Sequence, residues 1–88
     1  MKVLFLESFT RDLHRVRDKH LRERLRQVFL TLESAVSLEE IPHIKKLQGK
    51  GGFYRIRVRE LRVGFRLEGD QVTLIRVLDR KEIYRHFP

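Results

Sequence analysis

The chain has 88 residues, which fits a single domain spanning residues 1–88 with a thin core. It contains no cysteine, which excludes disulfides and thiolate chemistry and favours a reducing, cytoplasmic compartment. No apolar run approaches the roughly 20 residues that span a bilayer, so we expect no membrane partner. The apolar run at the start of the chain is too short for a signal peptide, and an acidic residue follows it too early.

The formal net charge of +8 is unevenly distributed along the chain. Residues 1–44 hold 8 Lys and Arg against 7 Asp and Glu, whereas residues 45–88 hold 12 against 5. A positive excess confined to one half predicts a polyanionic partner, such as nucleic acid or an acidic protein. A basic surface that only keeps the protein in solution is the alternative.

The first half of the chain predicts a strand followed by two helices. VLFLE at 3–7 is typical of a short strand, and Ser8 is a suitable N-cap for a first helix. Residues 8–36 predict an antiparallel helical hairpin that breaks near Asp18. The second helix has one apolar stripe at helical spacing, made of Leu21, Leu25, Val28, Phe29, Leu32 and Val36.

The middle of the chain predicts a connection rather than a long element. Ser37 and Glu40 have the spacing of a capping box for one short turn, which Pro42 ends. Glycines then predict a flexible turn at 49–52.

The second half predicts three strands. FYRIRVRE and LRVGFRLE alternate strictly, so 53–59 and 61–67 read as strands with one apolar and one basic face. EGDQ at 68–71 predicts a hairpin turn, and the nearly all-apolar 72–78 predicts a strand covered on both faces. The closing segment RKEIYRHFP, 80–88, fits one helical turn or an extended tail.

These elements predict an α+β fold in the order β-α-α-β-β-β, with the helical hairpin packed on one face of a small twisted antiparallel sheet. Period 2 then puts the arginines on the open face: Arg55, Arg57, Arg59, Arg62 and Arg66. Like charges across strands destabilise a sheet, but a bound polyanion would compensate them. The planar arginine fork matches phosphate oxygens two at a time, so nucleic acid suits this face. Arginines that only solubilise the sheet remain the alternative.

The C-terminal VLDRKEIYRHF adds Arg80 and Tyr84 just beyond the last strand, within reach of the open face. A tyrosine among arginines could stack on a base, or its phenol could be acidified by the neighbouring cations. Arginines with such a phenol suffice for RNA cleavage by the RNA's own 2′-hydroxyl, which needs proton removal, alignment and charge stabilisation. Ordinary packing of an amphipathic tail is the alternative for Tyr84.

The segments KLQG…YRIRV, LRVGF and VLDRKEIYR, with the element order, resemble the RelE/ParE superfamily of bacterial and archaeal toxins over almost the whole chain. The resemblance implies the RelE-like microbial RNase toxin fold. For the RelE-like branch it implies a ribosome-dependent endoribonuclease that cuts messenger RNA in the A site and inhibits translation, without metal or cofactor. The ParE-like branch shares the fold and inhibits DNA gyrase, which is the alternative, together with an inactive RNA-binding homologue.

The resemblance also implies the catalytic residues. The two basic positions after the glycine turn fall on Arg55 and Arg57, the arginine of the next strand on Arg62, and the late arginine and tyrosine on Arg80 and Tyr84. We assign Tyr84 as the general base, acidified by Arg57 and Arg80. Arg55 and Arg62 would bind the scissile phosphate, and Arg80 would help the 5′-oxygen leave.

Two departures from the family pattern bear on this assignment. The best-known nuclease of the family has lysines at the first two basic positions, and arginine cannot give up its proton as a base. Asp79 stands before Arg80, where many relatives have a neutral or basic residue, and could either hold Arg80 or weaken the site. His86 is the alternative base. His43 lies in a connection, and the sequence has no metal-site pattern.

The remaining basic residues predict further contacts to RNA, at Arg59, Arg66, Lys45 and Lys46 around the sheet and at Arg22 and Arg26 on the helices. The helical arginines, which also include Arg11, Arg15 and Arg24, suit ribosomal RNA, and helix solubility explains them about as well. The resemblance implies the ribosome, messenger RNA and a small cognate antitoxin as partners. An acidic or amphipathic antitoxin segment would cover the open face or displace the terminal residues.

Overall fold

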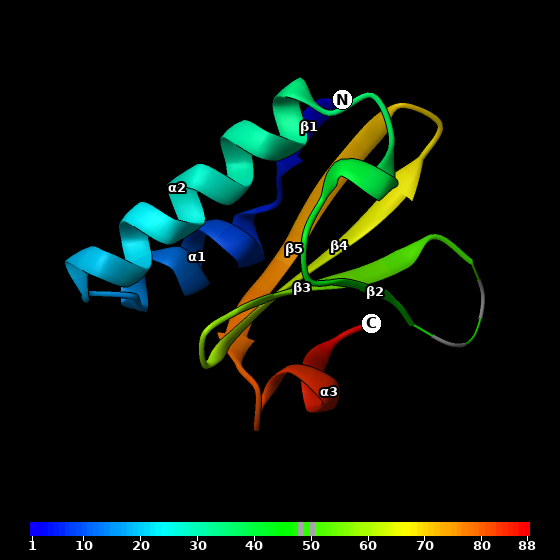
Figure 1. Cartoon of the computed structure of the whole chain (residues 1–88). Coiled ribbons are helices and arrows are strands. Elements are labelled where there is room, and N and C mark those ends of the chain that lie inside the picture. The colour runs from blue at the N-terminus through cyan, green and yellow to red at the C-terminus, as the bar shows by residue number, and fades with distance from the viewer. Residues whose placement is uncertain (48, 50) are drawn as a thin grey trace.

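The computed structural model describes residues 1–47, 49 and 51–88 (Figure 1). The turn that we predicted at 49–52 includes Lys50, which lies outside the described residues, as does Gln48. The elements in chain order are β1 (Lys2–Phe5), α1 (Glu7–Arg15), α2 (Lys19–Ser34), the 3₁₀ helix η1 (Leu38–Glu40), β2 (Ile44–Lys46), β3 (Phe53–Val58), β4 (Leu61–Glu68), β5 (Gln71–Asp79) and α3 (Ile83–His86).

The five strands form one sheet in the order β1-β5-β4-β3-β2, which confirms the α+β fold class. Two details differ from the prediction. The sheet is mixed, because β1 runs parallel to β5 while the other pairs are antiparallel. A short edge strand, β2, occupies part of the expected connection and pairs with β3. Local periodicity predicts that a segment is a strand, but it does not choose the partner of that strand.

The main core lies between α2 and the sheet. Leu25 and Leu32 from the apolar stripe of α2 are fully buried, and they belong to one cluster with Ile56 and Val63 of the sheet. The alternation predicted for β3 and β4 is therefore confirmed, since their apolar sets face α2. Burial of such side chains is the main stabilising term, because truncating one large core residue costs roughly 2–5 kcal/mol.

Helix α1 closes an edge of the sheet that no strand covers. β1 pairs only with residues 71–74 of β5, so the rest of that edge would expose backbone groups. Ser8 Oγ donates a hydrogen bond of 2.7 Å to the Ile75 carbonyl, and the Asp12 carboxylate accepts one of 3.1 Å from the Val77 amide. The prediction of Ser8 as a helix N-cap was therefore wrong: the cap position is Leu6, and the hydroxyl serves β5 instead.

Asp18 and Glu40 have the capping roles that their positions suggest. Asp18 is the N-cap of α2, and its carboxylate accepts from the amides of His20 and Leu21. Glu40 accepts from the amide of Ser37, as the capping-box spacing predicted.

The second face of the sheet is not fully open, which corrects the prediction. The C-terminal segment turns back over it, so that α3 lies on the opposite side of the sheet from α2 (Figure 1). Ile83 and Phe87 are buried, and the Phe87 ring covers Gly64 so closely that a Cβ there would come within 2.6 Å of it. Glycine at this strand position therefore makes room for the tail, a contact that no local pattern encodes.

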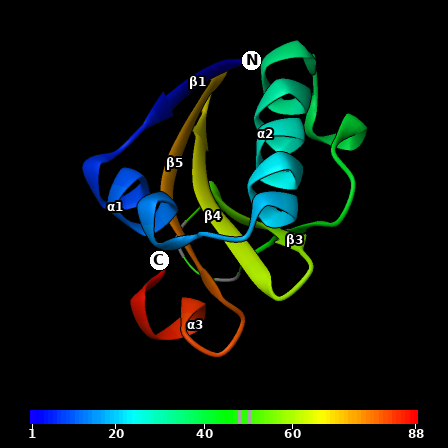
Figure 2. The same ribbon diagram turned by 90° about the vertical axis from the view of Figure 1, so that its left-hand side faces the viewer.

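The helices of the described residues include none long and apolar enough to cross a membrane. In the view turned by 90°, α1 and α2 lie on either side of β5 and β4, and α3 lies near the lower end of these strands (Figure 2). The C-terminal segment turns back over the face that carries the basic residues of β3 and β4, and β2 pairs with β3 at the edge of the sheet.

Candidate active site

The strand register brings three of the predicted catalytic arginines onto one face. Arg57 of β3 is directly opposite Arg62 of β4, and Arg55 is opposite Gly64. Their neighbours Ile56 and Val63 are buried on the other face, so the arginine side chains leave the sheet away from α2. A directly opposed pair of like charges destabilises a sheet, so this arrangement has a cost in stability.

Arg62 lies at the centre of the charged cluster. Its half-buried guanidinium donates hydrogen bonds of 2.7 and 2.9 Å to the carbonyls of Arg59 and Leu61. Burial lowers the pKa of Arg62, and the positive charges of Arg55, Arg57 and Arg80 lower it further, while Tyr84 has the opposite effect. The pKa of Arg62 therefore depends on all four of the other predicted catalytic residues. We define the arginine cluster as Arg55, Arg57, Arg62 and Arg80.

Arg80 and Tyr84 reach this cluster from the C-terminal segment. Arg80 follows β5 directly, and its amide donates a hydrogen bond of 2.8 Å to the Glu60 carbonyl in the β3–β4 turn. Tyr84 is 57% exposed on α3, between the buried Ile83 and Phe87. The two buried residues thus anchor α3 while leaving the phenol available to solvent and to a ligand.

Asp79 and His86 have partners of their own beside the cluster. The Asp79 carboxylate accepts a hydrogen bond of 2.9 Å from the Lys81 amide, so it shapes the turn that carries Arg80. His86 Nε2 lies 3.8 Å from a Glu82 carboxylate oxygen. Residues two apart on a helix do not face each other, so His86 lies on another side of α3 from Tyr84. His86 as the alternative base stays a prediction.

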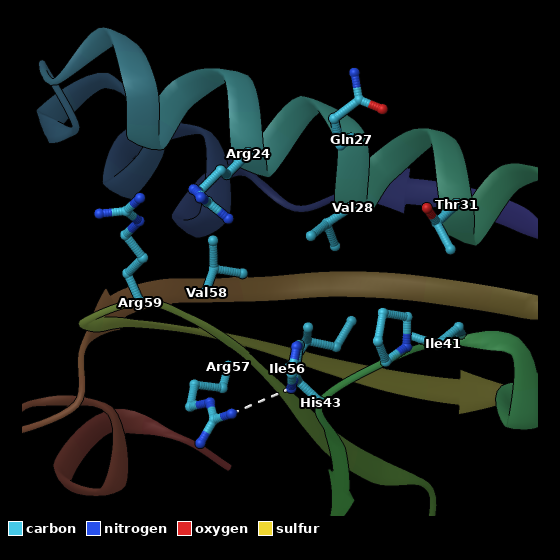
Figure 3. Close-up of a pocket in the computed structure, with 11 residues that line it drawn as sticks. Arg24, Gln27, Val28, Thr31, Ile41, His43, Ile56, Arg57, Val58 and Arg59 are labelled. Carbon is cyan, nitrogen blue, oxygen red and sulfur yellow. Dashed lines mark hydrogen bonds between the residues drawn. The ribbon is translucent and has the colours of Figure 1, made fainter.

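His43 is a residue of this site that the sequence analysis missed. Its carbonyl accepts hydrogen bonds of 3.1 Å from Arg55 Nη1 and of 3.1 Å from the Arg57 amide. Its ring Nδ1 lies 3.2 Å from Arg57 Nη2 (Figure 3). No spacing signal ties residue 43 to residues 55 and 57, because the contact arises only when β2 pairs with β3.

A cavity of about 500 Å³ between α2 and β3 adjoins the cluster, and Arg57 and His43 line it at the side of the cluster (Figure 3). Val28, Ile56 and Val58 supply its apolar walls. No local sequence pattern indicates this cavity, because its walls come from segments that only the fold brings together.

The other residues predicted to contact RNA are more dispersed. Lys45 pairs with Arg55 and shares its face, whereas Lys46 pairs with Tyr54 and belongs to the opposite face. Arg66 lies 5.5 Å from the Phe53 ring centre and within 3.5 Å of a Glu68 carboxylate oxygen. Lys45 and Arg66 therefore extend the basic face, with the charge of Arg66 partly compensated.

Arg59 does not share the face of Arg57, which corrects the prediction. Its φ of 56° ends the strand alternation in the β3–β4 turn, and its side chain lines the cavity beside Arg24 of α2 (Figure 3). Arg22 donates hydrogen bonds to two carbonyls at the end of α1, and Arg26 lies 3.3 Å from Glu23. Both helical arginines thus have partners within the hairpin, and their contact with RNA stays a prediction.

The arrangement suits a phosphodiester substrate. Arg55 Nε is buried and makes no hydrogen bond within the part of the chain that the structure describes. Four guanidinium groups with one phenol offer several donors to phosphate oxygens and one group that can accept a proton. The described residues contain no group of three His, Cys, Asp or Glu side chains that could hold a metal ion.

Comparison with known proteins finds toxins of type II toxin–antitoxin systems. Residues 3–84 match the model of a family described as the ParE toxin of the type II toxin–antitoxin system, parDE. The chain is 40% identical to toxin RelE3 of Methanocaldococcus jannaschii over the full length of both. Its fold matches the RelB–RelE antitoxin–toxin complex from Methanococcus jannaschii with a TM-score of 0.83 and 38% identity, covering 97% of this chain and 99% of that one.

A more distant structure has the same fold. The archaeal RelE–RelB complex from Pyrococcus horikoshii OT3 matches with a TM-score of 0.75 at 20% identity, covering 93% of this chain and 97% of that one.

Proposed function

The chain belongs to the RelE/ParE superfamily and is a RelE-like toxin of a type II toxin–antitoxin pair, and from this premise we propose that it is an endoribonuclease that cleaves messenger RNA in the ribosomal A site. The observation that carries the proposal is the strand register, which sets Arg57 directly opposite Arg62 and puts Arg55 on the same face, beside the segment that carries Arg80 and Tyr84. The family alone does not choose between activities, since the matching family model has the ParE description and the relatives have the RelE name.

The proposed reaction needs only the RNA and these side chains. Tyr84, as the phenolate, takes the proton from the 2′-hydroxyl, whose oxygen attacks the adjacent phosphorus. The bond from phosphorus to the 5′-oxygen breaks, and the leaving 5′-oxygen takes a proton from water, to which Tyr84 then returns the proton that it accepted. The products are a 2′,3′-cyclic phosphate and a 5′-hydroxyl. Tyr84 is the proton acceptor because arginines can only donate.

The arginine cluster stabilises the charge that develops on the phosphate in this reaction. Arg55 and Arg62 hold the non-bridging oxygens, and Arg80 stabilises the leaving 5′-oxygen. The ribosome contributes by presenting a single-stranded codon in a fixed conformation, which lowers the entropic part of the barrier. No metal or cofactor takes part in the proposed mechanism.

The partners follow from this role. Messenger RNA and the ribosome provide the substrate, in the cytoplasm. The protein also needs a cognate antitoxin, as in the two solved RelB–RelE complexes that share its fold. An acidic or amphipathic segment of that antitoxin would compensate the arginine cluster or displace α3, and cleavage would stop while it is bound.

Gyrase inhibition is the second candidate function, and the ParE description of the matching family model favours it. An inactive RNA-binding homologue is the third, favoured by arginines at the two positions where a lysine base would otherwise be available. Neither alternative requires Tyr84 to exchange a proton, so a change at the phenol separates them from the nuclease.

The test is to express the chain in cells without antitoxin and to map messenger RNA 5′ ends. We expect new ends within translated codons that disappear in Tyr84→Phe. Tyr54→Phe is the matched control, because it removes the same hydroxyl from a ring that stacks on Phe65, away from the cluster. Growth arrest with intact messenger RNA and DNA damage would contradict the nuclease and favour gyrase inhibition. Absence of both arrest and cleavage would favour the inactive homologue.

A further inference from the structure

His43 has a left-handed backbone conformation. Its φ is 61°, in the left-handed region that residues other than glycine seldom adopt. Such conformations persist where surrounding contacts determine them, and they are frequent at functional sites. The residue lies immediately before β2, so this conformation sets the direction in which its carbonyl and ring leave the chain.

Both polar parts of His43 are directed at the arginine cluster. The carbonyl accepts from Arg55 Nη1 and from the Arg57 amide, both at 3.1 Å. The ring Nδ1 lies 3.2 Å from Arg57 Nη2, and because arginine can only donate, Nδ1 is the acceptor and the ring proton is on Nε2. One residue therefore contacts the guanidinium groups of both β3 arginines, and Figure 3 shows the contact with Arg57.

Unlike an ion pair, these contacts do not neutralise the positive charge of the two arginines. Arg55 and Arg57 are two residues apart on the same face of β3, where their charges repel each other. A carboxylate between them would fix their positions but cancel part of the charge and repel phosphate. A carbonyl oxygen and a neutral imidazole nitrogen fix the same positions and leave the full positive charge for a ligand.

From this geometry we propose that His43 is a positioning residue, which holds Arg57 and Arg55 in the conformation that receives the scissile phosphate. The proposal rests on the proposed nuclease function for its role in catalysis, but the restraint on the arginines is a property of the free protein. The ring acts on Arg57 and the carbonyl acts on Arg55. Substitution at residue 43 therefore removes only the contact to Arg57.

The restraint can be measured without any RNA. Rotation of the Arg57 guanidinium is measured by nitrogen-detected NMR on the full chain, for the native protein, His43→Gly and His43→Asn. Glycine accepts a positive φ freely, so we expect His43→Gly to keep or raise the melting temperature while Arg57 rotates at least several-fold faster. Asparagine tolerates this backbone and offers an amide oxygen, so His43→Asn should restore slow rotation in part. Unchanged rotation in His43→Gly would overturn the proposal.

The catalytic consequence is measured on ribosomes programmed with a defined A-site codon. We expect His43→Gly to lower kcat roughly 10- to 100-fold with little change in KM, because misplacement of a catalytic group affects the transition state more than binding. His43→Asn should recover part of kcat. His14→Asn is the control, since His14 is an exposed residue of α1.

The two measurements separate the two claims. If the native chain cuts no RNA, the proposed function fails, and the rotation of Arg57 alone decides whether His43 restrains it. If the native chain cuts RNA and His43→Gly cuts with unchanged kcat, the nuclease stands and the positioning role is overturned.

Discussion

Arg76 and Arg62 are arginines of adjacent strands, but within the described part of the chain only the charge of Arg76 is compensated by a carboxylate. Arg76 Nε donates a hydrogen bond of 2.7 Å to Asp12, and Asp12 is only 4% exposed. That hydrogen bond raises the pKa of Arg76, although burial opposes the effect. Burial lowers the pKa of Arg62, and three neighbouring arginines lower it further. A compensated charge of the first kind stabilises the fold, whereas an uncompensated charge of the second kind is available to an anionic ligand.

The largest expected effect concerns the compensated pair. Asp12→Ala leaves Arg76 without its carboxylate and leaves the Val77 amide without an acceptor at the sheet edge. Breaking such a pair leaves a partly buried charge unpaired, so we expect a loss of roughly 3 kcal/mol in the free energy of unfolding. Urea denaturation measures it. Glu23→Ala is the control, because its pair with Arg26 is exposed and should contribute less than about 1 kcal/mol.

Substitution of Arg62, the uncompensated arginine, should lower the cleavage rate rather than the stability. Arg62→Gln keeps a donor for the turn carbonyls but removes the charge, so repulsion from Arg55 and Arg57 is relieved. We expect an unchanged or higher free energy of unfolding and a cleavage rate about 100-fold lower, as for loss of one transition-state donor. Measuring both quantities on the same preparations decides the comparison. Clear destabilisation with normal cleavage would show that Arg62 is a structural residue.

Gly64 links the two regions, because it is opposite Arg76 on one strand and Arg55 on the other. A Cβ at Gly64 would meet the Phe87 ring, so Gly64→Ala should displace the tail that carries Tyr84. We expect a loss of about 1–3 kcal/mol in stability from overpacking, with slower cleavage. The matched control is Gly51→Ala, since nothing lies within 4 Å of a Cβ there. Equal cleavage by both variants would contradict the anchoring role of Phe87.

The smallest expected effect concerns Asp18, whose carboxylate accepts hydrogen bonds from backbone amides at the start of α2. Hydrogen bonds from the amides of Leu21 and His20 lower its pKa below the ordinary value of 3.8. Because the pKa of the folded state is depressed, Asp18 stabilises the fold above its unfolded pKa, and this contribution is lost as pH falls through the folded pKa. Asp18→Asn should keep the cap at neutral pH and remove this part of the acid sensitivity. An unchanged pH profile below about pH 4 in thermal unfolding would contradict the expectation.

Local patterns in the sequence predicted the fold and the faces of the strands, because period 2 in β3 and β4 directly assigns Arg55 and Arg57 to one face and Ile56 to the other. The resemblance to a family added Arg80 and Tyr84 to the same site, and the structure brings both within range of Arg62. The catalytic roles of these residues stay predictions until cleavage is measured.

Contacts between distant segments could not be predicted in this way. Asp12 and Arg76 are 64 positions apart, and the Phe87 ring meets Gly64 only after the chain has turned back. The contacts of His43 depend on β2, which is three residues long and too short for a periodic signal. The buried residues of β5 step from Leu74 to Val77, and this break in alternation lies at the register shift between β4 and β5, which the sequence did not indicate.

The most direct test of the proposed cleavage reaction uses ribosomes programmed with two messenger RNAs that differ in one sugar of the A-site codon. We expect the native chain to cut the codon with ribose, leaving a 2′,3′-cyclic phosphate and a 5′-hydroxyl, and we expect 2′-deoxyribose at the scissile position to abolish the cut. Equal cleavage of both messages, products with a 5′-phosphate, or no cleavage of either message would contradict the claim that the arginine cluster and Tyr84 direct attack by the 2′-hydroxyl.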